Sequence, residues 1–229
     1  MKLNRAVPYS HRWPEFIPAD TRSNKDGNNV RICDNTRQMN TSLSHDSLAS
    51  GFSKARERMV DVQIEGRGIN APLVVAAMLN VPREMFVDPA DRRFAYMDGP
   101  LSIGEGQTIS QPFIVALMLE AAEIGPDDIV LEVGTGSGYA AAVASRIARK
   151  VHTIERHGSL AEQARSRFRD LRFENIDLLV GDGTLGWVDA SPFDAILVSA
   201  GGPDVPAALK QQLVIGGRLI IPVRLHDVD

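Results

Sequence analysis

The sequence predicts a doubly wound α/β fold with a mainly parallel sheet, and three observations support this class. From residue 128 onward, short apolar segments alternate with segments of helical periodicity. A glycine-rich stretch, VGTGSG, lies between the first apolar segment and the helix after it. Acidic residues end or follow two of the next apolar segments. Strands that alternate with helices in this way form parallel sheets with helices on both faces.

Length and composition indicate one domain with appendages. The 229 residues are 44% hydrophobic, which is enough for one core of ordinary size. The formal net charge of -4 gives no electrostatic indication of nucleic-acid binding. A single cysteine, Cys33, excludes an internal disulfide and a multi-cysteine zinc cluster, and agrees with a cytoplasmic location. No apolar run is typical of a signal peptide or a membrane span, so we expect no membrane contact.

Residues 1–48 are expected to form a flexible tail, because they are rich in Asn, Asp, Arg and Ser and offer little apolar surface to bury. Trp13, Phe16 and Ile17 are a candidate docking cluster, although such a cluster in a tail more often marks nothing. Residues 49–229 are expected to form the main domain. Its first part, 49–125, would hold helices and a loop, and its second part, 126–229, the sheet.

Three helices are expected before the sheet. The first is amphipathic and begins near Phe52. The second spans residues 71–79 and is capped by Asn70. The third runs from Pro112 to Ile124 and ends where a Gly-Pro pair interrupts the pattern.

Strands and helices are then expected in alternation to the end of the chain. The strands are expected at residues 128–133, 151–155, 176–180, 193–200 and 217–223. The helices are expected at residues 138–148, 159–171 and 205–213.

The glycine loop LEVGTGSGY matches one of three kinds of ligand site best. Gly134, Gly136 and Gly138 lie where a backbone without Cβ atoms can turn tightly and approach a ligand. An NTPase loop ends in Gly-Lys-Ser or Gly-Lys-Thr, which this sequence lacks. A dinucleotide loop has GxGxxG or GxGxxA, whereas the sixth position here is Tyr139. The spacing GxGxG after Glu132 resembles the S-adenosylmethionine loop of class I methyltransferases, while a nicotinamide or flavin enzyme stays open.

Two further acids point to a ligand at the same edge of the sheet. Glu155 ends the second expected strand, where a carboxylate can accept two hydrogen bonds from ribose hydroxyls, as it would also in an NAD enzyme. Asp182 follows the third strand and is suited to accept a hydrogen bond from an adenine amino group. Its alternative role is that of a turn residue between glycines. Because both acids and the glycine loop fall at one sheet edge, we favour ligand binding.

Motifs between Met59 and Val223 resemble the protein-L-isoaspartate (D-aspartate) O-methyltransferase family. They are VPREMFV, IGEGQTISQP, VLEVGTGSGY, IERHGSL, GDG, PFDAILVSA and GGRLIIPV. The resemblance implies a Rossmann-like methyltransferase fold with added N-terminal helices. It implies S-adenosylmethionine as donor, S-adenosylhomocysteine as product and no metal. It also implies a monomer that repairs isoaspartyl-containing proteins and peptides by methylating the α-carboxylate of the damaged residue.

The resemblance also assigns roles to single residues. In the family, the IGEGQTISQP loop lies over the donor and the substrate peptide. Ser110 stands at the active-site position with Thr108 beside it, and their hydroxyls would orient the substrate carboxylate. The alternative role of Ser110 is helix entry, where a serine cap contributes about 1 kcal/mol. The donor-binding residues implied are Gln107, Ile109, Glu132, Gly134, Thr135, Gly136, Ser137, Gly138, Glu155, Arg156, Asp182 and Gly183.

The chain departs from the family after IIPV, where members continue with a helix and closing strands. Here the residues RLHDVD follow, so the C-terminal strands are expected to be missing and the fifth strand to be an apolar edge, unless another surface covers it. Gly201 and Gly202 stand where members often have alanines, which would loosen the donor pocket. Three hypotheses remain: an active isoaspartyl methyltransferase, a fragment that binds the donor without transferring its methyl group, and a nicotinamide-dependent oxidoreductase.

Overall fold

A computed structural model of the chain describes residues 45–200 and 205–222, with side chains from residue 51 onward. The first 44 residues of the expected tail lie outside the described residues, and residues 45–48 begin a helix. The other expectations outside these ranges concern Trp13, Phe16, Ile17, Cys33, Gly201, Gly202 and residues 223–229. Within the described ranges, no helix has the length and hydropathy needed to cross a membrane.

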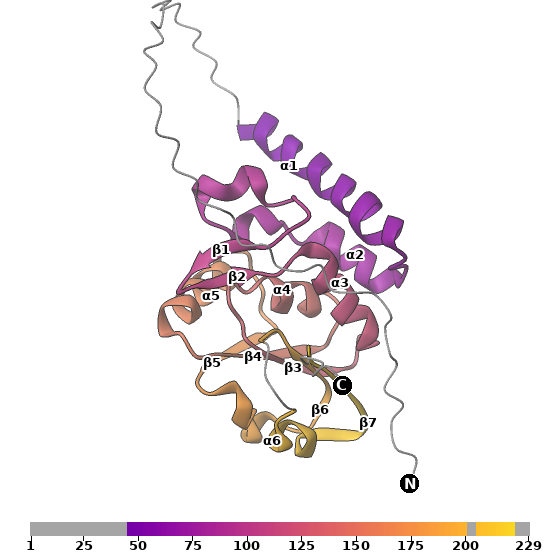
Figure 1. The fold of residues 1–229 in the computed structure, drawn as a ribbon, viewed down its shortest axis with the longest axis vertical. Helices are drawn as coiled ribbons and strands as arrows, with labels where there is room; N and C mark the ends of the chain where they lie inside the picture. The colour runs from indigo at the N-terminus through magenta and orange to yellow at the C-terminus, as the bar shows by residue number, and fades with distance from the viewer. Residues whose placement is uncertain (1–44, 201–204, 223–229) are drawn as a thin grey trace, which may run out of the picture. The chain divides into compact units, whose positions relative to one another are not determined.

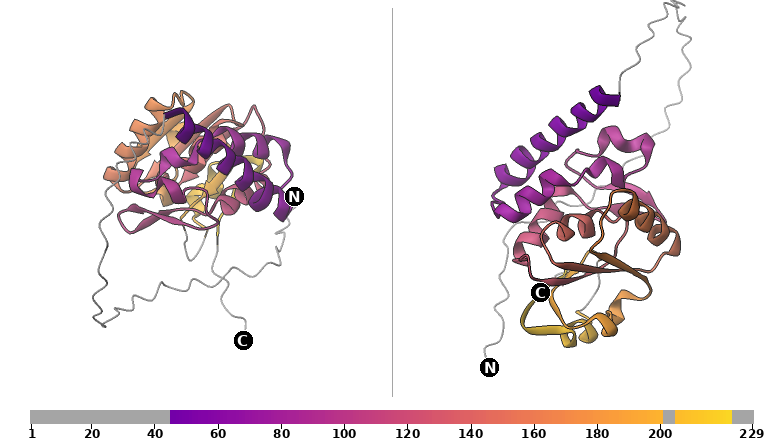
Figure 2. Two further views of the ribbon diagram at one scale, coloured as in Figure 1. Left: turned by 90° about the horizontal axis from the view of Figure 1, so that it is seen from above. Right: turned by 180° about the vertical axis from the view of Figure 1, so that it is seen from behind.

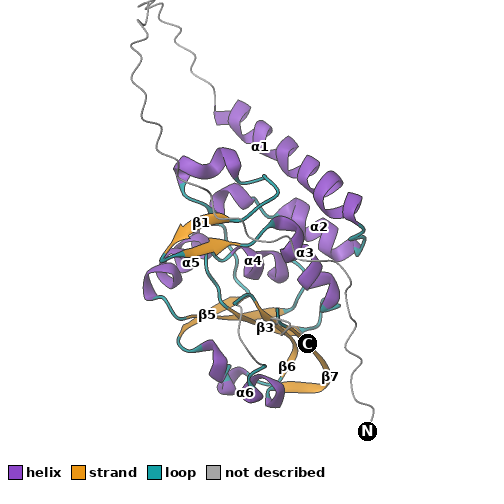
Figure 3. Ribbon diagram, viewed as in Figure 1, coloured by secondary structure: helices purple, strands orange, loops and turns teal. Residues whose placement is uncertain are grey.

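The centre of the domain is a five-stranded parallel sheet (Figures 1 and 3). Its strands lie in the order β5-β4-β3-β6-β7. They are β3 (Ile129–Val133), β4 (Lys150–Glu155), β5 (Ile176–Val180), β6 (Phe193–Val198) and β7 (Leu213–Ile220). The chain builds outward from β3 to one edge and then crosses back to add β6 and β7 on the other side, which is the doubly wound topology that the sequence predicts.

Helices cover both faces of this sheet. In Figure 1, α4 (Tyr139–Ser145) and α5 (Gly158–Asp170) lie on one side and α6 (Ala207–Gln211) lies on the other. Alternate residues of β3 therefore enter different cores, with Val130 in the larger cluster and Leu131 and Val133 in the smaller one. Burial on both faces explains why β3 reads as a nearly continuous apolar run.

A further layer of helices lies over α4 and is visible from above and behind in Figure 2. Helices α2 (Pro72–Asn80) and α3 (Pro112–Ala121) pack on each other, and α2 also packs on α4. Two short 3₁₀ turns, Arg83–Phe86 and Pro89–Phe94, follow α2. The antiparallel hairpin of β1 (Leu101–Gly104) and β2 (Gln107–Ile109) then leads into α3.

The first helix begins earlier than predicted. Helix α1 runs from His45 to Met59 and continues as a π-helical turn, Val60–Ile64, and a 3₁₀ turn, Glu65–Arg67. Its start was missed because few apolar residues occur before Phe52, so the sequence there has no helical hydrophobic period.

The predicted cap of α2 is wrong. The N-cap is Ala71, and the Asn70 side chain donates instead to the carbonyl oxygen of Gly68. The backbone N–H groups of Asn70 and Ala71 both donate to Glu120 Oε1 at 3.0 Å. A carboxylate from α3 therefore satisfies the start of α2, and a contact fifty residues away leaves no local signal in the sequence.

Other element ends also differ by a few residues. Strand β7 begins at Leu213, four residues before the prediction, and α6 is shorter than expected. Among the described residues β7 is one edge of the sheet, as predicted. The first half of β7 was not predicted, because the glycine pair in LVIGGRLI is typical of a bend or a bulge rather than of a strand interior.

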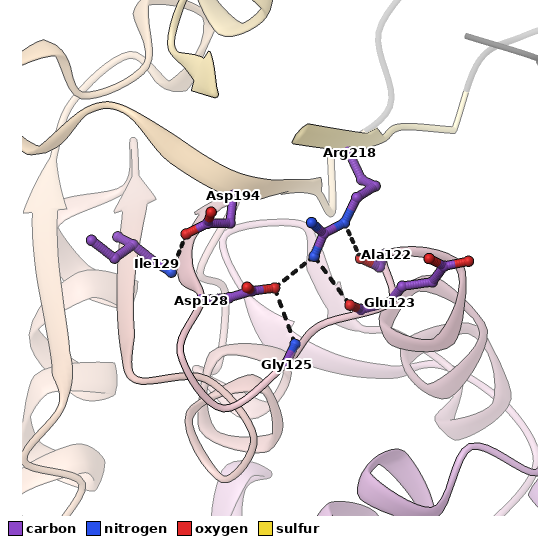
Figure 4. A network of polar contacts seen from close by, with 7 residues as sticks. All are labelled: Ala122, Glu123, Gly125, Asp128, Ile129, Asp194 and Arg218. Carbon is purple, nitrogen blue, oxygen red and sulfur yellow. Dashed lines mark hydrogen bonds and ion pairs between the residues drawn. The ribbon is translucent and has the colours of Figure 1, made fainter. Parts of the chain in front are cut away.

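Polar contacts link β7 to the segment between α3 and β3 (Figure 4). Arg218 donates to the carbonyl oxygens of Ala122 at 2.7 Å and Glu123 at 3.1 Å, and it pairs with Asp128 at 2.6 Å. Asp128 also accepts the N–H of Gly125 at 3.0 Å. This network therefore holds the edge strand against the end of α3, close to the amino ends of the central strands.

Candidate active site

A cavity of about 760 Å³ lies at the carboxyl ends of β3, β4 and β6. In doubly wound sheets, ligands bind at this edge, where the strand order reverses. All but one of the predicted site residues line the cavity: Gln107, Thr108, Ile109, Ser110, Glu132, Gly134, Thr135, Gly136, Ser137, Glu155, Arg156, Asp182 and Gly183. The fold thus brings together residues from segments far apart in the sequence.

Gly138 is the predicted residue that does not line the cavity. It is the N-cap of α4 and has a positive φ of 92°. A Cβ atom at this position would lie 2.7 Å from the ring of Phe168 on α5. Gly138 therefore allows α4 and α5 to approach each other, and the glycine spacing in the sequence reflects helix packing as well as ligand access.

Glu155 fixes the shape of the glycine loop. Its Oε2 accepts the N–H of Gly136 at 2.7 Å, and its Oε1 accepts the N–H of His157 at 3.0 Å. The side chain is buried. Each carboxylate oxygen has a second lone pair, so that Glu155 can still accept hydrogen bonds from a ligand in the cavity.

Glu132 is a buried acid at the base of the cavity. Its Oε2 accepts from Thr153 Oγ1 at 2.7 Å, and its Oε1 faces Ser199 Oγ at 3.4 Å. Thr153 Oγ1 also bonds Thr135 Oγ1 at 2.6 Å. Burial raises the pKa of Glu132 to about 8, although the hydrogen bonds from Thr153 and Ser199 oppose the shift; the nearby Glu155 carboxylate adds to it.

Asp182 has the turn role that the sequence leaves open, and it also lines the cavity. Its Oδ1 accepts both the backbone N–H and the hydroxyl of Thr184, at 2.9 and 2.8 Å, so that it caps the short turn Gly183–Leu185. These hydrogen bonds lower the pKa of Asp182. The side chain is exposed and also lines the cavity, so turn formation does not exclude a ligand contact.

The segment that leads into α3 contributes two hydroxyl groups to the cavity, Thr108 from β2 and Ser110 from the loop after it. Ser110 does not cap α3, because the N-cap is Gln111 with Pro112 at the first helical position. The Gln111 side chain does not cap the helix and donates instead to Asp98. Helix entry therefore does not account for the serine at position 110.

The tip of the β1–β2 hairpin is linked to the start of α5. Glu105 accepts a hydrogen bond from Ser159 Oγ at 2.6 Å, and it lies 3.9 Å from His157 Nδ1. Behind the tip, Ile103 is so close to the glycine loop that a Cβ on Gly136 would lie 3.2 Å from it. The hairpin thus lies against the glycine-loop side of the cavity.

Several cavity residues were not predicted. They are Val115, Val133, Tyr139, Ala140, Ile154, His157, Gly181, Thr184, Ser199 and Ala200. Ser199 and Ala200 follow β6 directly, so the rule that carboxyl ends of central strands reach the crevice could have found them. The apolar residues carry no polar signal that distinguishes them from the core. The described residues contain no group of three or more His, Cys, Asp or Glu placed to hold a metal ion.

Comparison with known proteins identifies the family of this chain. The family model described as protein-L-isoaspartate(D-aspartate) O-methyltransferase matches residues 54–228. The chain belongs to this family. A protein-L-isoaspartate O-methyltransferase from Pelotomaculum thermopropionicum is 60% identical over 168 residues, which are 73% of each chain. Protein-L-isoaspartate O-methyltransferase 2 from Pelobacter propionicus is 57% identical over 168 residues, covering 73% of this chain and 75% of the relative.

Solved structures agree with the family and the fold. One protein-L-isoaspartate O-methyltransferase is 34% identical with a TM-score of 0.67 and covers 73% of this chain, which spans only 55% of that longer chain. A Plasmodium falciparum structure of the same description, in complex with S-adenosyl-L-homocysteine, is 25% identical with a TM-score of 0.66. It covers 76% of this chain, which spans 85% of it. The predicted methyltransferase family and doubly wound fold are thereby confirmed.

Gly138→Ala should destabilise this isoaspartyl methyltransferase family member by about 2–4 kcal/mol, because alanine disfavours positive φ and its Cβ would overlap the Phe168 ring. Urea unfolding followed by circular dichroism measures the change. Gly158→Ala is the matched control, since a Cβ at Gly158 meets nothing within 4 Å. Equal stabilities of the two variants would contradict the packing role of Gly138.

Glu132→Gln should make the stability of the protein less dependent on pH. The folded state holds the Glu132 proton more tightly than the unfolded state, so its contribution is complete below pH 4.5 and is lost as the pH rises to about 8. Above pH 8 the free energy of unfolding of the variant should therefore exceed that of the wild type by up to about 5 kcal/mol, with little difference near pH 4.5. Urea titrations from pH 4.5 to 9 measure this, and parallel pH profiles would refute the raised pKa.

Proposed function

We propose that this chain transfers a methyl group from S-adenosylmethionine to the α-carboxylate of L-isoaspartyl residues in damaged proteins and peptides. The observation that carries the proposal is that Thr108 and Ser110 line the same cavity as the glycine loop. A methyl donor held by the loop and a carboxylate held by the hydroxyls would therefore meet in the same cavity. Membership of the isoaspartyl methyltransferase family supports the same reaction.

The charges of the cavity fit a positively charged donor better than a pyrophosphate. Glu132 and Glu155 are both buried in its wall, and the Gly136 N–H is already donated to Glu155. A pyrophosphate would lose that amide and face the Glu155 carboxylate, whereas a positive charge would be attracted to that carboxylate and would favour ionisation of Glu132. This argues against a nicotinamide cofactor. S-adenosylmethionine, when bound, supplies an electrophilic methyl group on a sulfonium.

We assign the donor to the predicted residues that line the cavity. Glu155 would accept hydrogen bonds from the ribose hydroxyls through its remaining lone pairs, and Asp182 would accept one from the adenine amino group. Glu132 would face the positive part of the donor. The other donor-binding residues proposed are Gln107, Ile109, Gly134, Thr135, Gly136, Ser137, Arg156 and Gly183. Gly138 is assigned to helix packing instead.

The protein's own groups act mainly by positioning. A carboxylic acid with a pKa of about 3.5 to 4 is already ionised at neutral pH, so the substrate needs no general base. Thr108 and Ser110 would donate hydrogen bonds to one carboxylate oxygen and aim the other along the line of attack. Closure by the hairpin would exclude water and hold the reacting atoms together. In this scheme Ser110 is not a nucleophile.

Paired peptides test the proposed reaction. The protein is incubated with methyl-labelled S-adenosylmethionine and either an isoaspartyl peptide or its aspartyl twin. We expect base-labile label on the first peptide alone, because only the isoaspartyl residue has a free α-carboxylate. In the aspartyl twin the α-carboxyl group forms the peptide bond, and the free carboxylate is that of the side chain. No transfer to either peptide would refute the proposal, and calorimetric binding of S-adenosylhomocysteine in that case would identify a protein that binds the donor only.

Ser110→Ala should lower turnover about 10- to 100-fold, the loss expected when one hydrogen bond to a charged group is removed. Affinity for S-adenosylhomocysteine should stay nearly unchanged, because the hydroxyl is assigned to the substrate. Ser102→Ala is the matched control, since Ser102 lies in the same hairpin, is exposed and pairs with Thr108 across the strands. If Ser110→Ala changed the melting temperature but not the turnover, Ser110 would have only a structural role.

A further inference from the structure

Arg83 is a charged side chain in the interior of the domain. It belongs to the short turn Arg83–Phe86 and has 0% exposure. No carboxylate of the described residues lies within ion-pair distance of its guanidinium, and its Nη1 has no hydrogen-bond partner there. Burial also lowers the pKa of Arg83, because the charged guanidinium is removed from water. An unpaired buried charge costs several kcal/mol, so packing alone would be served better by an apolar side chain.

The two hydrogen bonds of Arg83 lead to the loop that lines the cavity. Its Nη2 donates to the carbonyl oxygen of Ser110 at 2.8 Å, and its Nε donates to that of Ala95 at 2.7 Å. The planar guanidinium thus joins the backbone just before the hairpin to the backbone just after it. These contacts fix the residue that carries the proposed substrate hydroxyl.

The Arg83 guanidinium lies over the ring of Tyr139, at the start of α4. Its central carbon is 4.7 Å from the ring centre of Tyr139, which lines the cavity and follows the glycine loop. Phe86, from the same turn, meets that ring edge-on at 5.6 Å. The turn therefore places one side chain in contact with both the substrate loop and the start of α4.

We propose that Arg83 is a positioning residue for methyl transfer, which holds the Ser110 backbone against Tyr139 and so sets the distance between the serine hydroxyl and the glycine loop. The inference rests on the proposed function, because it acts through Ser110. An arginine is needed for this task, since a lysine ammonium cannot serve two carbonyl oxygens and an aromatic face in one planar arrangement.

Arg83→Lys tests the inference in the paired-peptide assay. The kcat should fall roughly tenfold or more, because a small displacement of an orienting group is costly to rate. The dissociation constant of S-adenosylhomocysteine should change by less than about twofold, since donor contacts persist. Amide hydrogen exchange should become faster at residues 107–111 and stay unchanged in β3.

A double-mutant cycle separates positioning from general destabilisation. If Arg83 acts through the Ser110 hydroxyl, then Arg83→Lys in the Ser110→Ala background should lower kcat by less than about twofold further. A purely structural role predicts the same loss in both backgrounds, and that result would overturn the inference.

Arg218→Lys is the matched control. The Arg218 guanidinium also donates to two backbone carbonyl oxygens (Figure 4), but Arg218 does not line the cavity. This variant should lower the melting temperature and leave kcat unchanged well below that temperature. An equal loss of kcat in both lysine variants would overturn a specific role for Arg83.

Arg83→Gln covers the case in which the lysine variant does not fold. Glutamine removes the buried charge and retains one amide donor for a carbonyl oxygen. It should show the same loss of kcat with donor affinity retained. Unchanged kcat in a folded Arg83 variant of an active protein overturns this inference alone, whereas a wild type that transfers no methyl group overturns the proposed function and the inference together.

Discussion

The carboxylate of Glu155 is the contact on which the cavity depends. By accepting the N–H groups of Gly136 and His157, it joins the turn after β3 to the turn after β4. Parallel strands supply the approximate position of such turns, but their ends have free backbone donors that must be satisfied. One buried side chain meets this need and leaves the cavity wall negatively charged, which in turn favours a cationic ligand.

A second set of contacts places the substrate loop relative to that wall. The Arg83 guanidinium donates a hydrogen bond to the Ser110 carbonyl oxygen, and Glu105 at the hairpin tip accepts one from Ser159. The hairpin is thus held at both ends, by a buried cation on one side and an exposed acid on the other. In our proposal these contacts hold the hairpin and the loop after it in place, so that the Ser110 hydroxyl can orient the substrate carboxylate.

The sequence could predict the sheet and most of the cavity because both depend on local patterns. Continuous apolar runs locate β3 to β6, and their carboxyl ends then identify Glu155 and Asp182 without any knowledge of contacts. The roles of Glu120 and Arg83 could not be predicted in this way. Each side chain forms hydrogen bonds with backbone groups that are distant in the sequence. The sequence also does not reveal that a charged residue such as Arg83 is buried.

Gly138 shows a different limit of the same reasoning. Its spacing matches a ligand loop, yet its missing Cβ makes room for Phe168. One motif can thus record two constraints, and only the three-dimensional contacts separate them.

The Arg218 network lies near the amino ends of the central strands, whereas the cavity lies at their carboxyl ends. The two ends of the sheet share strands but no side chains in these contacts. Heat resistance can therefore be engineered or selected at one end while the chemistry at the other end is preserved.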